Sequence, residues 1–134
     1  MDTSVLQEGR RVYVTGLLQT MDGGRVLMCP KVLDLGAGDS VRPLGIGCRS
    51  LAPGSGLAPD CLLVRAWGAY TKMDDSTFTL NDGGAETKCI VPSGITLEPG
   101  WTYLAVTGIA STEMVGDQAR LVLRVRRQGD ILPL

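Results

Sequence analysis

The strongest constraint in this sequence is a short phrase that occurs twice. The run VTGLLQTM at residues 14–21 returns as VTGIASTEM at residues 106–114. In both copies a run rich in β-branched residues is interrupted by one glycine and then resumes, which is typical of a strand with a bulge or a sharp bend. Two copies of one strand–bend–strand unit indicate duplicated β modules.

Composition narrows the fold class further. The 134 residues suit one domain, or one domain and a piece of another, and the 44% share of hydrophobic residues is enough for a core. The 18 glycines and 7 prolines favour frequent turns over long helices. A net charge of −1 and an isoelectric point near 5.3 argue against strong non-specific attraction of the whole chain to nucleic acid or anionic membranes, although a local basic face stays open.

Location and cysteine chemistry are weakly constrained. No apolar run approaches the roughly 18 residues of a membrane span, and residues 1–10 lack the apolar segment of a signal peptide. The cytoplasm is therefore the default expectation, with secretion open if the sequence belongs to a longer protein. Cys29 and Cys89 lie in apolar runs and are expected to be buried. Cys48 and Cys61 are expected as free thiols, with a disulfide between them as the alternative.

Turn signals divide the chain into three parts. Residues 1–35 are expected to hold a β-hairpin, since residues 11–15 alternate apolar with polar before an Asp-Gly-Gly turn. Residues 36–60 read as a linker by their Gly, Pro, Ala and Ser content, although residues 41–45 could still dock on a neighbouring barrel. Residues 61–134 contain five expected strands in quick succession. These strands span residues 61–73, 77–81, 87–92, 103–114 and 119–127.

Several of these segments together resemble the OB-fold. They are VRAWGAYT at residues 64–71, FTLNDG at 78–83, VTGI at 106–109 and RVR at 124–126. The pattern is similar to the tandem OB modules of large, often secreted, bacterial proteins and nucleases. It covers residues 61–130 as a whole barrel, whereas residues 9–35 resemble only the last two strands of a preceding module. The resemblance implies an all-β chain, with a five-stranded Greek-key OB barrel preceded by an extra β-hairpin and Gly68 as the bend of its first strand.

The same resemblance implies where a ligand would bind. OB barrels hold oligonucleotides or oligosaccharides on the face of strands two and three, between the loops that here span residues 72–77 and 113–118. Period-two alternation places polar and aromatic side chains on the outside of these strands. Trp67 could pack against the rest of the chain instead of stacking on a ligand. Arg124 and Arg126 could lie on a solvated outer face instead of contacting phosphate. The expected ligand-binding face consists of Arg65, Trp67, Lys72, Thr79, Lys88, Arg124 and Arg126.

Catalysis and metal binding have little support. The chain contains no histidine, so the usual general base is missing, and no Gly-x-Ser-x-Gly motif surrounds Ser93. Turn chemistry explains Asp74, Asp75 and Asp82 better than a calcium loop does. We therefore expect a non-enzymatic module without metal or cofactor.

Two functions remain from different classes. Single-stranded nucleic acid is the leading ligand by resemblance, and the alternative is a structural or protein–protein interaction module within a larger protein. Carbohydrate binding comes third, with only Trp67 in its favour.

The hairpin of residues 9–35 is expected either to fold back on its own barrel or to form a homodimer, because an isolated hairpin is marginally stable.

Overall fold

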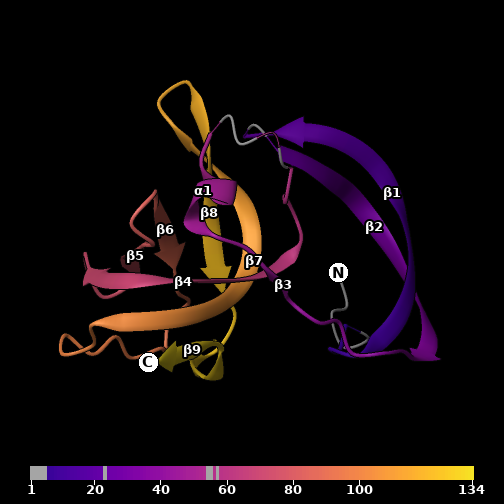
Figure 1. Ribbon diagram of the computed structural model, residues 1–134. Coiled ribbons are helices and arrows are strands. Elements are labelled where there is room, and N and C mark those ends of the chain that lie inside the picture. Colours follow the sequence, from indigo (N-terminus) through magenta and orange to yellow (C-terminus); the bar gives the residue numbers. More distant parts are fainter. Residues whose placement is uncertain (1–5, 23, 54–55, 57) are drawn as a thin grey trace. The chain divides into compact units, whose positions relative to one another are not determined.

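The computed structural model describes residues 6–22, 24–53, 56 and 58–134, which are mostly β-strand (Figure 1). The chain divides into two compact units, residues 1–42 and 43–134. The first unit carries a two-stranded antiparallel sheet, and the second a mixed seven-stranded sheet. The fold is thus mostly β, as the sequence predicts.

The first unit contains the expected hairpin. Strand β1 (Arg10–Met21) pairs with β2 (Gly24–Ala37) in antiparallel register from Arg10–Ala37 to Met21–Gly24. The register shifts beside Gly16, the glycine of the first repeated phrase. A Cβ atom at this position would lie 2.7 Å from the Met28 carbonyl oxygen, so the strands approach too closely there for a side chain. The repeated glycine is therefore needed for space.

The second unit contains a closed ring of five hydrogen-bonded strands. They are β4 (Leu63–Lys72), β5 (Thr77–Asn81), β6 (Glu86–Ile90), β7 (Tyr103–Val115) and β8 (Gln118–Val125). The neighbours run β4-β5-β6-β8-β7, and β7 pairs with β4 again. The pairing of β6 with β8 is parallel and every other pairing in the ring is antiparallel. All five strands expected from the sequence are present, with ends within two residues of the prediction.

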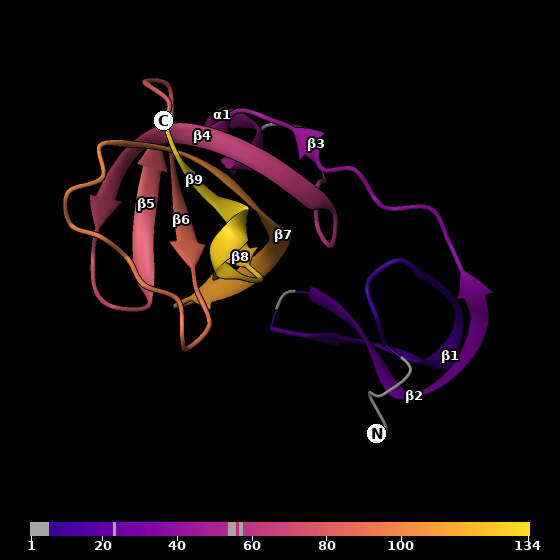
Figure 2. The same cartoon turned by 90° about the horizontal axis from the view of Figure 1, so that it is seen from below.

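The ring closes because β4 pairs along both edges. Its first part, residues 63–69, pairs with β7, and its last part, residues 69–72, pairs with β5. Gly68 lies at the changeover, and a Cβ atom there would lie 2.7 Å from the carbonyl carbon and oxygen of Asn81. Gly108 plays the same part in β7, where a Cβ atom would lie 2.5 Å from the Arg124 carbonyl oxygen. Figure 2 shows the strong curvature of both strands.

Alternate side chains of the ring strands form one core. Val64 and Ala66 of β4, and Leu123 and Val125 of β8, point inward, as period-two alternation predicts. Tyr70 packs its ring 5.4 Å from Phe78 and 5.8 Å from Trp101, measured between centroids. These contacts extend the core toward the connection between β6 and β7.

Residues 43–60, which composition assigned to a linker, belong to the second unit. They form the short strand β3 (Leu44–Gly45), which pairs in parallel with β4, and the single-turn helix α1 (Cys48–Leu51). The Cys48 and Leu51 side chains are buried in the core, and the Cys48 backbone N–H donates to Asp82 Oδ2 over 2.7 Å. Side-chain burial therefore holds residues 48–51 in place, within a stretch whose composition suggests flexibility.

Two short elements near residue 130 were not predicted. A 3₁₀ turn, η1 (Gln128–Asp130), precedes a short strand β9 (Ile131–Pro133) that pairs antiparallel with β7. Cys29 was expected to be buried, and this was wrong: it is exposed, with a backbone φ of 48° beside the hairpin's register shift. The burial of Cys89 and the free thiols of Cys48 and Cys61 are as predicted. Cys48 is buried and Cys61 is exposed.

The alternation in β8 gives a direct stability test. We expect Leu123→Ala to lower the free energy of unfolding by about 2–5 kcal/mol, because Leu123 is fully buried in the ring core. Its neighbour Arg124 is exposed, so Arg124→Ala should change that free energy by no more than about 0.5 kcal/mol. Chemical denaturation measures both variants, and equal losses would contradict the register of β8.

Candidate ligand-binding surface

The first part of β4 presents Arg65 and Trp67 outward, as alternation predicts. Trp67 is 44% exposed and stands opposite Ala105 of β7. The Arg65 guanidinium donates from Nε to the Thr107 hydroxyl over 2.9 Å. These two side chains form a small platform with one aromatic ring and one cation, beside β7.

Thr79 and Lys88 lie opposite each other on β5 and β6. Thr79 was expected to be accessible on the binding face, but it is only 7% exposed. Its strand is central, so Thr71 flanks it on one side and the longer Lys88 on the other. The Lys88 ammonium is held by the Glu113 carboxylate, with Nζ–O distances of 3.0 and 3.1 Å. Neither residue therefore offers a free polar group of the kind we expected.

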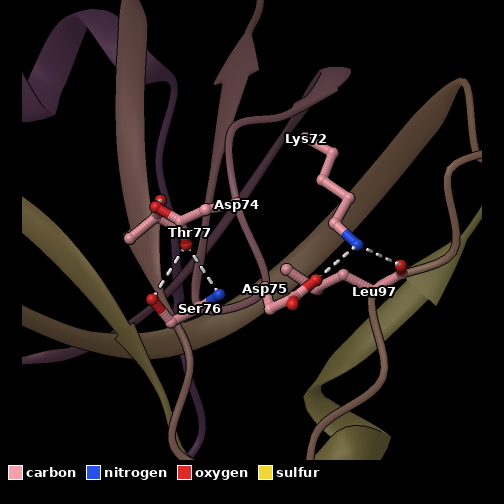
Figure 3. A network of polar contacts seen from close by, with 6 residues as sticks. All are labelled: Lys72, Asp74, Asp75, Ser76, Thr77 and Leu97. Atoms are coloured by element: carbon pink, nitrogen blue, oxygen red, sulfur yellow. Dashed lines mark hydrogen bonds and ion pairs between the residues drawn. The ribbon is translucent and has the colours of Figure 1, made fainter.

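Lys72 and the β4–β5 loop form a network of polar contacts (Figure 3). The Lys72 ammonium pairs with Asp75 over 3.0 Å and donates to the Leu97 carbonyl over 3.4 Å. The hydrogen bond with Asp75 raises the pKa of Lys72. Lys72 was expected to contact a ligand, but the loop already supplies its counterion, Asp75.

Asp74 organises the same loop. Its carboxylate accepts hydrogen bonds from the Thr77 hydroxyl (2.6 Å), the Ser76 backbone N–H (2.7 Å) and the Ser76 hydroxyl (2.9 Å). These bonds, the one from Thr77 first, lower the pKa of Asp74 to about 2. The arrangement is the turn chemistry predicted from the sequence.

Arg124, near the end of β8, and Arg126, just after it, have different surroundings. Arg126 makes a bidentate ion pair with the buried Asp130, with Nε–Oδ2 and Nη2–Oδ1 distances of 2.9 and 3.0 Å. Arg124 is exposed, opposite Ile109 of β7 and beside Ile90 of β6. Among the described residues, Arg124 has no carboxylate within ion-pair distance.

The expected binding face is therefore not one continuous basic surface. Three of its five cations, Lys72, Lys88 and Arg126, are paired with carboxylates. The remaining two cations are separated by a strand. Arg65 lies on β4 with Trp67, whereas Arg124 lies on β8, and β7 runs between these two strands. Only Thr79 and Lys88 are direct cross-strand neighbours.

The structure also contains a groove that the sequence did not predict. It has a volume of about 420 Å³ and lies between α1, β6 and the β7–β8 hairpin. We call it the β6–β8 groove. Its lining consists of Leu51, Ala52, Pro53, Glu86, Lys88, Glu113, Val115, Gln118, Arg120, Leu121 and Val122.

The β6–β8 groove exists because two strands of the ring diverge. β8 pairs with β7 along residues 118–125, but with β6 only at Leu123 and Arg124. On the side that faces β6, no described strand pairs with residues 118–122. The turn residue Gly116, with φ 60°, makes Val115–Gln118 the closing pair of a two-residue hairpin. Hydrogen bonding then alternates along β8, so the backbone groups of Ala119 face away from β7.

The charges of the β6–β8 groove balance. Two carboxylates (Glu86, Glu113) and two cations (Lys88, Arg120) line it, together with apolar side chains from α1 and β8. One carboxylate and one cation already form the Lys88–Glu113 ion pair. A ligand of this groove would therefore meet apolar side chains, a strand edge and no net charge.

Metal-binding clusters, membrane-spanning helices and known relatives give no assignment for the described part of the chain. Within the described residues, no three His, Cys, Asp or Glu side chains are grouped so that they could hold a metal ion. None of the described helices is long and apolar enough to cross a membrane. Comparison with protein-family models, curated proteins and solved structures found no match.

The hydrogen bonds of Asp74 give a pH prediction. A lowered carboxyl pKa means that the ionised group stabilises the loop above its unfolded-state pKa of about 3.9, and that this contribution is lost as the pH falls towards 2. Carboxyl carbon NMR should show Asp74 titrating near pH 2, with the Ser76 amide shifting in parallel. Asp75→Asn is the control and should leave this titration unchanged. A titration of Asp74 near pH 3.9 would contradict the hydrogen-bonded loop.

Proposed function

We propose that residues 43–134 are an OB-type barrel that serves as a non-enzymatic binding module. Its support is the order of the ring, β4-β5-β6-β8-β7, with one parallel pairing between the third and last strands. This order, with its one parallel pairing, resembles the five-stranded Greek-key arrangement of an OB barrel. Because unrelated ligands share this fold, the ligand has to be argued from the surface itself.

We propose an extended segment of another protein as the ligand of the β6–β8 groove. The observation that carries this proposal is the edge of β8 at residues 118–122, which faces β6 without pairing to any described strand and borders a groove with apolar walls. Strand edges of this kind bind peptides by adding a strand, with backbone hydrogen bonds for affinity and side-chain pockets for specificity. The balanced charge of the groove suits a polypeptide of mixed sequence better than a polyanion.

Single-stranded nucleic acid is the second candidate. The exposed Trp67 beside Arg65 favours it, because base stacking on aromatic rings with nearby cations is the usual mode of such binding. Against it stand the carboxylate partners of Lys72, Lys88 and Arg126, which an incoming phosphate would have to displace. We therefore place it behind protein binding.

A selection with displayed peptides tests the first candidate. Linear peptides selected on the immobilised chain should bind with an affinity that Ala119→Pro lowers by about 1–2 kcal/mol, because proline removes an edge N–H donor. Ala119→Gly is the matched control, since it removes the methyl group and keeps the donor. Isothermal titration with one selected peptide measures all three proteins.

Two outcomes would contradict peptide binding at this edge. One is equal affinity of the Pro and Gly variants for the selected peptide. The other is tight binding of a labelled oligothymidylate that falls steeply with salt and is weakened by Trp67→Ala, which would favour nucleic acid instead.

A further inference from the structure

The hairpin β1–β2 exposes far more apolar surface than a lone sheet sustains in water. Ten of its large hydrophobic side chains are exposed, by fractions between 36% and 67%. They are Val12, Tyr13, Val14, Leu17, Leu18, Met21, Leu27, Met28, Leu33 and Leu35. Together they expose as much surface as about five fully exposed residues. Two-stranded hairpins are marginally stable alone, so these side chains need a partner surface.

The repeated phrase indicates which kind of partner β1 takes. Gly16 of β1 and Gly108 of β7 occupy the same position of the repeat, and each lies against a carbonyl oxygen of the next strand along the chain. β7 is covered on its other edge by an antiparallel strand, β4, over residues 103–109. By the same alignment, residues 11–17 of β1 form an edge built to receive an antiparallel strand. In the first unit no described strand occupies it.

The two edges of the hairpin differ in their protection. β2 carries Pro30, Lys31 and Asp34 within its length, and proline and charged residues are the usual guards of an exposed edge. β1 has no proline, and from Val12 to Met21 it has no charged residue. Of the two open edges of the hairpin, the β1 edge is therefore the less protected.

We propose that β1 pairs with β1 of a second copy of this chain, antiparallel about a two-fold axis at Thr15. Such an axis places the same face of both hairpins on the same side of the joined sheet. It also makes the contact self-complementary. It places Tyr13 opposite Leu17 of the partner subunit and Val12 opposite Leu18 of the partner subunit. Arg10 and Arg11 face Thr20 and Gln19 of the partner subunit, so no like charges stand opposite each other. The two hairpins form one four-stranded sheet.

Sedimentation velocity of the whole chain over a range of concentrations tests this dimer. Leu17→Lys should weaken the dimer by about tenfold or more, because it places two ammonium groups against apolar side chains in the contact. Leu35→Lys is the matched control. It adds the same charge at a residue of similar exposure on β2, and it should leave the dissociation constant within about twofold.

A charge pair tests the two-fold register. Tyr13→Glu should weaken the dimer as Leu17→Lys does, whereas the double variant should recover most of the lost affinity. In the double variant the carboxylate introduced at position 13 faces the ammonium introduced at position 17 of the other copy, twice per dimer. Within one chain the two positions are four residues apart on one strand, too far to pair.

Three results would overturn the proposal. The first is a wild-type chain that stays monomeric at all concentrations. If its hairpin amides were nevertheless protected from hydrogen exchange, the hairpin would fold back on its own chain. The second is equal weakening by Leu17→Lys and Leu35→Lys, which would mean association through a sheet face. The third is a double variant as weak as the two single variants combined.

Discussion

The second unit depends on the close backbone contact at Gly68. β4 has to leave β7 and join β5 within a few residues, and at the changeover its backbone approaches that of Asn81 too closely for any side chain. Gly108 allows the corresponding approach of β7 to β8. Without both contacts the sheet could not close into a ring, and the core side chains Val64, Leu80 and Leu123 would lose their common interior.

Ring closure also creates the β6–β8 groove. β6 and β8 pair only at Cys89–Leu123 and Ile90–Arg124 and diverge before these residues, while β8 stays paired to the longer β7. α1, anchored by Cys48 and Leu51, supplies the opposite wall. The candidate binding edge is therefore a consequence of this divergence of β8 from β6. The ion pairs on the outside then decide which ligands the surface suits, because most of its cations already have carboxylate partners.

The sequence predicted much of the fold because period-two alternation and turn residues are local signals. The strand over residues 77–81 was predicted with its observed ends, and the inward side of Leu123 followed from counting. α1 was missed because Cys48 and Leu51 are buried among core residues that lie far away in the sequence. Composition does not show such contacts. The site was harder still. The partners of Lys88 and Arg126 are 25 and 4 residues away, and only the folded chain brings the first pair together.

The most direct test of this account is the free energy of unfolding of Gly68→Ala. A methyl group at this position meets backbone atoms of Asn81, which cannot rotate away as the end of a flexible side chain can, so we expect a loss of about 1–3 kcal/mol or more. Gly45→Ala is the control, since a Cβ atom at Gly45 meets nothing within 4 Å, and its effect should stay within about 0.5 kcal/mol. Equal stabilities of the two variants would contradict the closed ring on which the groove depends.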